Sequence, residues 1–258
     1  MKIPKEIVYE IYNYLGNTDK RRLRQTSKLY DMKFKEKQLL EELIEDGYDI
    51  PEKYYNNYVL LIIQRGRLDM VQKMNIADLC ERAARYGQLH ILIWAHEQGH
   101  LWNYWSFHYA AYQGSLECLK YLYEQGCPWT DNTCYYAARH LECLTFLHEH
   151  GCPWTTNTCS NAANWDLECL KYAHEHGCPW DEATCWHAAY SGKLDCLKYA
   201  HERGCPWDKY TCEKAAVGQL ECLKYAIENG CPWDKDACQE AARGFPTCMD
   251  YIIKMMVI

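Results

Sequence analysis

Apolar positions recur at helical spacing in short runs along this chain, and turn residues separate the runs. The clearest example lies in residues 178–204. Cys185, Ala188 and Ala189 have the spacing i, i+3, i+4, which places them on one face of a first helix. Ser191-Gly192 then marks a turn, after which apolar residues resume on several faces of a second helix. The pattern predicts a helix-turn-helix unit whose second helix packs between neighbours.

The ends of these two helices carry their own signals. Pro179 stops the preceding helix, because its ring fixes φ and it has no N–H group. Asp181 is a favourable N-cap for the first helix. Gly204 stands where the C-terminus of a helix favours a left-handed residue, so it should end the second helix.

The same unit recurs with a nearly fixed period. The tetrapeptide Gly-Cys-Pro-Trp is written five times, and the spacings between its cysteines are 25, 26, 27 and 26 residues. A period in this range is typical of a solenoid, in which each small unit buries its apolar faces against its neighbours. The sequence therefore predicts an all-α solenoid of about eight repeats. The copies occupy residues 100–126, 127–151, 152–177, 178–204, 205–230 and 231–257, with fainter copies at 73–99 and 52–73.

Two copies depart from the template. The copy at 127–151 has lost two residues between Ala138 and Leu141, including the turn glycine. We expect a tighter corner between its two helices. The last copy has Pro246 where the other copies have leucine, and we expect its second helix to start late.

Seventeen cysteines would suit a disulfide framework, but their places in the repeat argue against one. Six share one position of the first helix, six share one position of the second helix, and five belong to Gly-Cys-Pro-Trp. Stacked helices lie about 8–10 Å apart, whereas a disulfide allows a Cα separation of roughly 7 Å. Free cysteine packs as a small apolar side chain. We therefore expect buried, reduced thiols and a reducing compartment.

The Leu-Glu-Cys-Leu-Lys-Tyr and His-Glu-x-Gly-Cys-Pro-Trp blocks resemble the short ankyrin-like repeats that are abundant in proteins of giant DNA viruses of amoebae. The resemblance covers residues 52–257. Ordinary ankyrin repeats are about 33 residues long and carry a β-turn finger. Because the copies in this chain are shorter, we expect the finger to be reduced to the Cys-Pro-Trp loop.

Residues 1–35 do not repeat. They open with Ile-Pro-x-Glu-Ile, continue as an apolar stripe at helical spacing, and close with Ser-Lys-Leu-Tyr. This segment resembles an F-box, with Ile3 at a position where the family more often has leucine. The resemblance implies a three-helix head that binds a Skp adaptor. The residues expected to contact the adaptor are Ile3, Pro4, Ile7, Ile11 and Leu15.

This resemblance implies both a domain organisation and a function. We expect an F-box-like head at 1–35, a linker helix and half-repeat cap at 36–51, and the solenoid at 52–258. The chain would be the substrate-recognition subunit of a Skp–cullin–F-box ubiquitin ligase, and its repeats would hold an unidentified target protein. If the chain is viral, the adaptor and the cullin would be the host's. The alternative is a scaffold or sequestering protein whose N-terminal helices only cap the solenoid, since solenoid ends need capping.

The residues that vary between copies point to the target-binding surface. They are the two positions between the first-helix cysteine and the alanine pair, where the framework stays fixed while the side chains change. We interpret them as exposed, and aromatic side chains are enriched at binding hot spots. Neutral drift on a solvated face is the alternative interpretation. The candidate target-binding residues are His108, Tyr109, Tyr135, Tyr136, Ser160, Asn161, Trp186, His187, Glu213 and Lys214.

Charge narrows the choice of partners. The net charge is −7, and residues 20–37 hold eight basic and two acidic residues, a local +6 that leaves −13 for the rest. An acidic solenoid repels phosphate backbones, so we expect no nucleic-acid partner. The chain has no apolar run of 18 residues and no apolar segment near Met1, so we expect no membrane span and no secretory signal. We expect a monomer in the cytoplasm, of the host if the chain is viral, or in the nucleus.

One motif suggests an enzyme. His96-Glu97-Gln98-Gly99-His100 matches the zinc-protease pattern H-E-x-x-H, which makes a zinc metalloenzyme a remote alternative. That chemistry needs both histidines on one face of a continuous helix, whereas Gly99 predicts that the helix ends before His100. The chain has no phosphate loop and no dinucleotide fingerprint. We therefore expect no catalytic activity, no cofactor and no metal.

Overall fold

The computed structural model describes residues 59–60 and 62–256. The chain divides into two units, Met1–Ile62 and Ile63–Ile258, and the second unit contains the regular repeats. Its described residues form helices and no strands. The predicted head, the linker and the predicted adaptor contacts lie outside the described residues. Those contacts are Ile3, Pro4, Ile7, Ile11 and Leu15.

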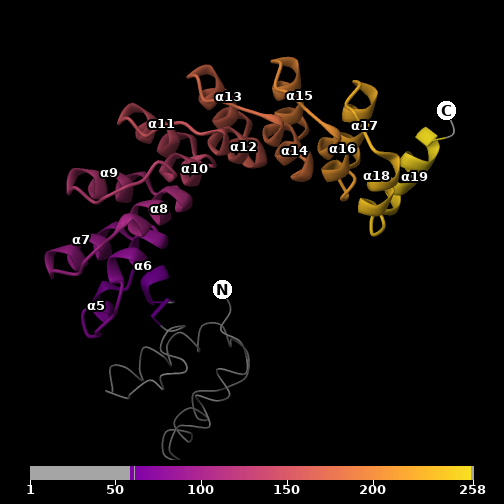
Figure 1. Ribbon diagram of the computed structural model, residues 1–258. Coiled ribbons are helices and arrows are strands. Elements are labelled where there is room, and N and C mark those ends of the chain that lie inside the picture. Colours follow the sequence, from indigo (N-terminus) through magenta and orange to yellow (C-terminus); the bar gives the residue numbers. More distant parts are fainter. Residues whose placement is uncertain (1–58, 61, 257–258) are drawn as a thin grey trace, which may run out of the picture. The chain divides into compact units, whose positions relative to one another are not determined.

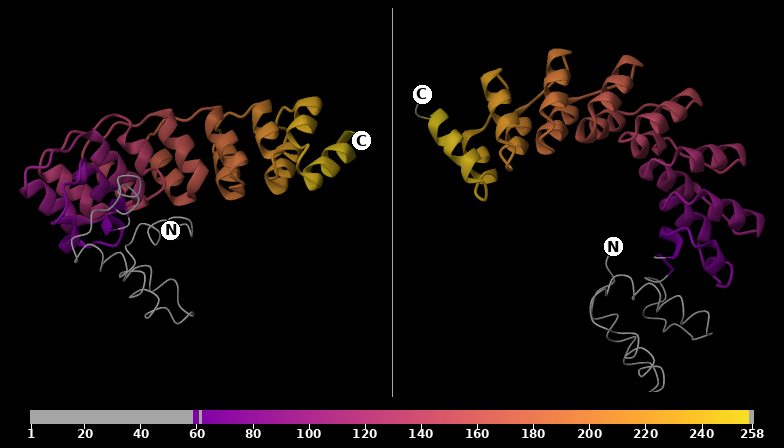
Figure 2. Two further views of the ribbon diagram at one scale, coloured as in Figure 1. Left: turned by 90° about the horizontal axis from the view of Figure 1, so that it is seen from below. Right: turned by 180° about the vertical axis from the view of Figure 1, so that it is seen from behind.

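The helices of the second unit alternate between two rows, as Figures 1 and 2 show. The first helix of each repeat lies in the inner row of a curved stack: α6 (Leu79–Arg85), α8 (Tyr104–Gln113), α10 (Thr133–Ala137), α12 (Thr156–Trp165), α14 (Glu182–Tyr190), α16 (Lys209–Ala215) and α18 (Lys235–Ala241). The second helix lies in the outer row: α5 (Leu68–Val71), α7 (Leu89–Glu97), α9 (Leu116–Glu124), α11 (Leu141–Glu149), α13 (Leu167–Glu175), α15 (Leu194–Glu202), α17 (Leu220–Glu228) and α19 (Pro246–Met256). The all-α repeat solenoid predicted from the period is confirmed.

Small buried residues hold neighbouring inner helices together. Cys185, Ala188 and Ala189 of α14 have no exposed surface, and the equivalent residues of the other copies are buried in the same way. Helix α14 packs on both α12 and α16. Because alanine and cysteine have short side chains, the helix backbones can approach closely while the core remains filled. The apolar stripe read from the sequence is therefore the contact surface between repeats.

The predicted helix signals also have their expected geometry. The Asp181 carboxylate accepts a hydrogen bond from the Ala183 backbone N–H at 3.0 Å, which caps α14. Gly204 ends the second helix of the same copy with φ 80°, a conformation in which a side chain would be strained. Asp181 therefore marks the end of the loop before this copy, and Gly204 marks the start of the loop after it.

The two irregular copies behave differently from each other. In the copy at 127–151, only Ala138, Arg139 and His140 separate α10 from α11, and the His140 backbone N–H donates to the Ala137 carbonyl at 2.8 Å. This connection is as long as those between α6 and α7 and between α14 and α15, so the tighter corner expected there is wrong; the missing residues instead shorten α10 to five residues. The late start expected for the final helix is wrong, because α19 begins at Pro246 itself. The first N–H of a helix has no acceptor within the helix, so a proline loses nothing at that position.

All seventeen cysteines are free and buried. The thiols of the Cys-Pro-Trp loops bond to the preceding loop: Cys205 donates to the Asp181 carbonyl at 3.3 Å, and Cys231 donates to the Asp208 carbonyl at 3.2 Å. Burial raises the pKa of Cys143 and Cys169 to about 12. A thiol with so high a pKa is protonated and inert, which fits a structural role.

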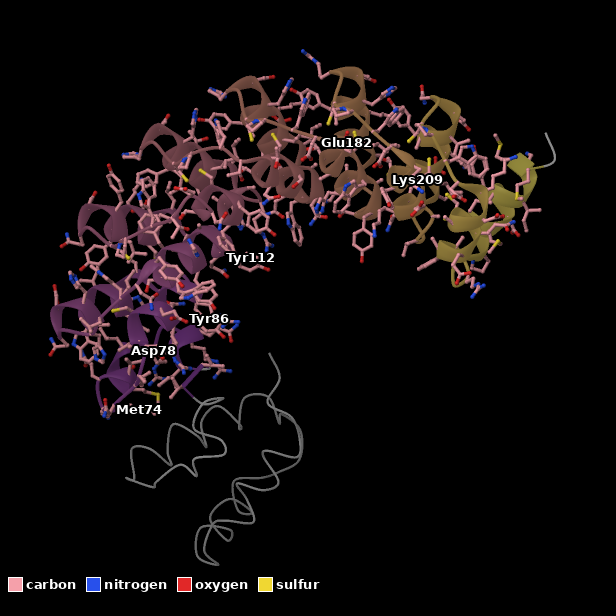
Figure 3. All side chains as sticks on the ribbon, viewed as in Figure 1. Met74, Asp78, Tyr86, Tyr112, Glu182 and Lys209 are labelled. Carbon is pink, nitrogen blue, oxygen red and sulfur yellow. The ribbon has the colours of Figure 1, made fainter. Side chains whose placement is uncertain are left out.

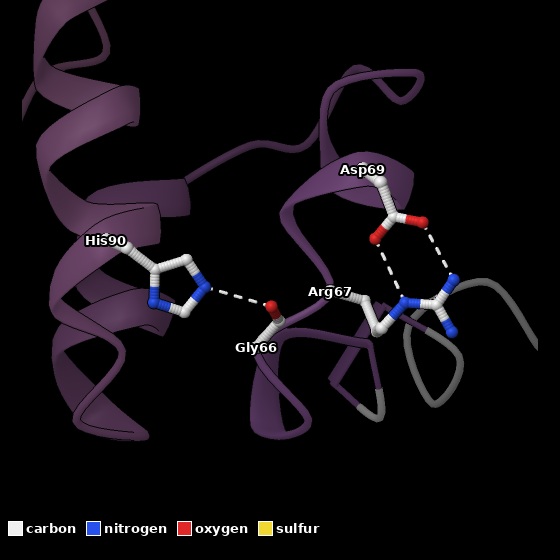
Figure 4. A network of polar contacts seen from close by, with 4 residues as sticks. All are labelled: Gly66, Arg67, Asp69 and His90. Atoms are coloured by element: carbon white, nitrogen blue, oxygen red, sulfur yellow. Dashed lines mark hydrogen bonds and ion pairs between the residues drawn. The ribbon is translucent and has the colours of Figure 1, made fainter.

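Histidines at or just before the start of a second helix also bond to the turn of the preceding repeat. At the N-terminal end of the unit, the His90 Nε2 lies 2.9 Å from the Gly66 carbonyl, next to the Arg67–Asp69 ion pair (Figure 4). The His140 Nε2 makes the same kind of contact with the Tyr112 carbonyl at 3.2 Å. Within the described residues, no helix is both long and apolar enough to cross a membrane.

Candidate functional site

The inner row presents a surface that differs from repeat to repeat. We define the inner face as four positions of each first helix: the two residues before the alanine pair and the two directly after it. These positions lie opposite the buried stripe because a helix turns by 3.6 residues. Figure 3 shows Tyr86 and Tyr112 on the inner edge of the row. In the four copies from 100 to 204 the inner face consists of His108, Tyr109, Tyr112, Gln113, Tyr135, Tyr136, Arg139, His140, Ser160, Asn161, Asn164, Trp165, Trp186, His187, Tyr190 and Ser191.

Most candidate target-binding residues have solvent-exposed surface on this face. The residues that are at least partly exposed are Tyr109, Tyr135, Tyr136, Asn161, Trp186, His187, Glu213 and Lys214. The expected exposure is wrong for two of the ten. His108 is 4% exposed and Ser160 is 3% exposed, so neither side chain can make a broad contact with a partner.

His108 is buried because aromatic neighbours surround it. Its ring stacks on Tyr136 of the next repeat with 4.6 Å between centroids, and Trp105 meets it edge-on at 5.5 Å. The His108 Nε2 lies 2.9 Å from the Thr130 hydroxyl, while its Nδ1 has no partner among the described residues. Burial lowers the pKa of His108 to about 4, so this ring is neutral near pH 7. His108 is therefore a buried residue on which the exposed part of the inner face packs.

Ser160 is buried for a simpler reason. Its side chain is short, and its hydroxyl donates to the Asn157 carbonyl of the same helix at 3.1 Å. Such a bond back onto the helix satisfies the hydroxyl without solvent. The first variable position of α12 is therefore part of the packing between repeats.

The variable residues also touch one another across the repeat joints. The Asn161 amide donates to the Tyr135 carbonyl at 2.7 Å, and the Lys214 ammonium lies 6.0 Å from the centroid of the Trp186 ring. In each case the first variable residue of one copy meets the second variable residue of the next, as His108 meets Tyr136. The sequence treats these positions as independent, whereas the stacking of repeats joins them into one surface.

Sequence reasoning missed the residues that follow the alanine pair. Tyr112, Trp165 and Tyr190 are 49%, 41% and 53% exposed, and they are among the more exposed aromatic side chains of the inner face. In the copy between those of Tyr112 and Trp165, Arg139 directly follows the alanine pair, as Tyr112 does in the preceding copy. A signal was available: these positions vary between copies, and they lie three or four residues after the other variable positions, on the same side of the helix.

The outer row repeats one aromatic arrangement. In its clearest copy, His201 stacks on Trp207 of the next loop at 3.8 Å, and its Nδ1 is hydrogen-bonded to the Tyr225 hydroxyl of the next outer helix at 2.9 Å. The Trp of the Cys-Pro-Trp loop thus packs between neighbouring repeats. The same two contacts occur in His96–Trp102–Tyr121, His148–Trp154–Tyr172 and His174–Trp180–Tyr199.

These contacts also account for the H-E-x-x-H match. Helix α7 ends at Glu97, and Gly99 has φ 81°, so His100 lies beyond the helix. The His96 Nδ1 is hydrogen-bonded to the Tyr121 hydroxyl at 3.0 Å. The two histidines are therefore not on one face of a continuous helix, which the zinc-protease arrangement requires. Within the described residues, no three His, Cys, Asp or Glu side chains are grouped to hold a metal ion.

Comparisons with known proteins give repeat proteins of low similarity. The crystal structure of the human ASB11 ankyrin repeat domain matches with a TM-score of 0.37 and 17% identity, covering 66% of this chain and 82% of that one. The pentatricopeptide repeat protein PPR10, in complex with an 18-nt psaJ RNA element, matches with a TM-score of 0.34 and 15% identity, covering 75% of this chain and 37% of that one. No protein-family model and no curated protein matches the chain. The functional interpretation therefore rests on the residues of this chain.

Proposed function

We propose that this chain is a protein-interaction module whose inner face holds a partner protein. Helical repeat solenoids of this architecture typically provide extended binding surfaces. The observation that carries the proposal is the contrast between a constant buried framework and a varied, aromatic inner face. Tyr112, Trp165 and Tyr190 are large, partly exposed side chains in successive or nearby copies, and residues of this kind dominate protein–protein contacts.

We further propose that the module is the substrate receptor of a Skp–cullin–F-box ubiquitin ligase. The support is the F-box-like pattern of residues 1–35, which would dock on the Skp adaptor through Ile3, Pro4, Ile7, Ile11 and Leu15. The inner face would then present its partner for ubiquitination. Because the repeats resemble those of giant DNA viruses, the adaptor and the cullin would come from the host.

Co-purification of the full chain with purified Skp adaptor tests the ligase proposal. Wild-type protein should retain the adaptor, and the double variant Pro4→Ala/Ile7→Asp should lose it, since a buried charge disrupts an apolar anchor. A matched control, Trp186→Ala/Tyr190→Ala, changes the inner face and should leave adaptor binding intact. Circular dichroism of each variant checks that the repeats still melt cooperatively.

A second candidate function has its own support. If wild-type protein retains no adaptor while its helical content is intact, residues 1–35 are a cap and the chain is a scaffold or sequestering protein. Solenoid ends need a polar cap, and in the sequence the head and the linker at 36–51 precede the first repeat. Under that outcome the inner face keeps its proposed role as the partner-binding surface.

A further inference from the structure

The inner face has one unusual corner, in the copy that lost two residues. The first helix of this copy is shortened to α10, Thr133–Ala137, and Ala138, Arg139 and His140 connect it to α11 without the usual turn glycine. The His140 ring is anchored to the Tyr112 carbonyl of the preceding copy at 3.2 Å. This contact fixes the residue beside it, Arg139, on the inner face.

Two aromatic rings flank the Arg139 guanidinium. Its Cζ lies 4.7 Å from the centroid of the Tyr112 ring and 4.4 Å from that of the Trp165 ring. Tyr112 belongs to the preceding copy and Trp165 to the following one, so the cation lies between rings from both sides. A guanidinium stacks its flat faces on aromatic rings and directs its N–H donors outward along its edge. We name Arg139, Tyr112 and Trp165 the arginine clamp. The two rings therefore hold the Arg139 guanidinium in one orientation.

The N–H donors of the Arg139 guanidinium are available to a ligand. Within the described residues the Arg139 side chain has no hydrogen bond and no ion pair, and its nitrogens are not among the buried atoms without a partner. They therefore face solvent. Arg243, at the end of the same row, is paired with Glu240.

The residues around the arginine clamp favour a negatively charged ligand. The inner face of the four copies from 100 to 204 contains no Asp and no Glu, whereas each outer helix of the same copies contains two acidic residues. No carboxylate of this face competes for Arg139. Arg139 is the one Arg or Lys of the inner face in these four copies, which is too little positive charge for a nucleic-acid backbone, whose binding depends on neutralising many phosphates. A single carboxylate fits the planar fork in a bidentate pair.

We propose that the arginine clamp anchors an acidic segment of the partner protein, through the carboxylate of one Asp or Glu. The carboxylate lies against the edge of the Arg139 guanidinium, and apolar side chains beside it pack on the Tyr112 and Trp165 rings. This inference rests on the proposed role of the inner face and adds the chemistry of the partner.

Peptide selection on the full chain tests the proposal. A phage library of random twelve-residue peptides is selected against immobilised protein, and the enriched peptides are synthesised and measured by fluorescence anisotropy. We expect an Asp or Glu at a fixed position of these peptides. Arg139→Gln should weaken their binding at least about tenfold, because hydrogen bonds to charged groups are among the stronger ones. Changing the peptide acid to its amide should weaken binding to wild type by a similar factor and have little further effect on the variant.

Three further variants make the outcome decisive. Arg139→Lys keeps the charge without the fork and should bind more weakly than wild type. Arg203→Gln is the matched control: this arginine also lies over a ring, 5.6 Å from the centroid of Tyr199, but belongs to the outer row, and the change should leave binding unaltered. Tyr190→Ala probes the inner face away from the clamp. Thermal melts of each variant confirm that the repeats are folded.

The failures of the two proposals can be told apart. Peptides that bind equally well to Arg139→Gln but lose affinity with Tyr190→Ala would overturn the clamp and leave the inner face as the binding surface. Binding that no inner-face variant changes, or a library that yields no enriched peptide, would overturn both. Tighter binding of an oligo-dT strand than of any selected peptide, with loss in Arg139→Gln, would assign the clamp to nucleic acid instead.

Discussion

The inner and outer rows of the solenoid both contain aromatic residues, and they use them in opposite ways. In the outer row, a histidine, a tryptophan and a tyrosine make the same two contacts in four copies, with His–Trp centroid distances that run from 3.7 Å in His174–Trp180 to 4.4 Å in His148–Trp154. In the inner row, no two copies present the same four residues. Repetition thus marks residues that hold the repeats together.

The contrast also shows where variation is free and where it is constrained. His108 and Ser160 vary in sequence but are buried, so they were selected in part by packing against their neighbours. Arg139 and Tyr190 vary and reach solvent. A varied position is therefore a candidate contact only after its exposure is known, and the comparison of the two rows supplies that test.

The largest expected effect concerns the buried stripe beneath the inner face. Ala188→Leu should lower the free energy of unfolding by about 1–3 kcal/mol, because the added methylenes have no space between α12, α14 and α16. Trp186→Ala, two residues away but on the inner face, should change it by less than about 0.5 kcal/mol. Urea titration followed by circular dichroism measures both. Equal losses would mean that the inner face is structural as well.

A smaller effect should separate the two rows directly. Tyr199→Phe removes the hydroxyl that is bonded to the His174 Nδ1 at 3.0 Å and should cost about 1 kcal/mol of stability. Tyr190→Phe removes a hydroxyl from a side chain that is 53% exposed, and it should be neutral within measurement error. Thermal unfolding of the two variants beside wild type is sufficient. If Tyr190→Phe is the more damaging change, the roles assigned to the rows are reversed.

A further effect depends on pH and tests the buried support of the inner face. Burial lowers the pKa of His108 to about 4, below the ordinary value near 6.5. The stability that this neutral ring contributes is present above pH 6.5 and is lost as the pH falls toward 4, because the unfolded chain then binds a proton that the folded chain rejects. His108→Phe should therefore melt with a shallower dependence on pH between 6.5 and 4. Parallel curves for variant and wild type would mean that His108 is solvated.

Much of the fold followed from the sequence alone. The period of Gly-Cys-Pro-Trp predicted the solenoid, and the cysteine and alanine stripe of each copy predicted the buried contact between inner helices. Asp181 and Gly204 predicted helix ends at the residues where they occur. These predictions succeeded because each depends on interactions within about one repeat, and helical spacing, caps and left-handed glycines act locally. Pro246 did not delay the start of the last helix, because a proline is well suited to the first position of a helix.

The sequence by itself determined the repeat, its two helices and the residues that vary between copies. Only the tertiary structure decided which of the varied side chains meet solvent and which meet each other. The stacking of one copy on the next buries His108 against Tyr136 and brings the rings of Tyr112 and Trp165 to 4.7 Å and 4.4 Å from the Arg139 Cζ. These partners are separated by about one repeat along the chain, a distance over which local spacing rules say nothing. Their contact is set by how closely the small buried residues allow the helices to approach.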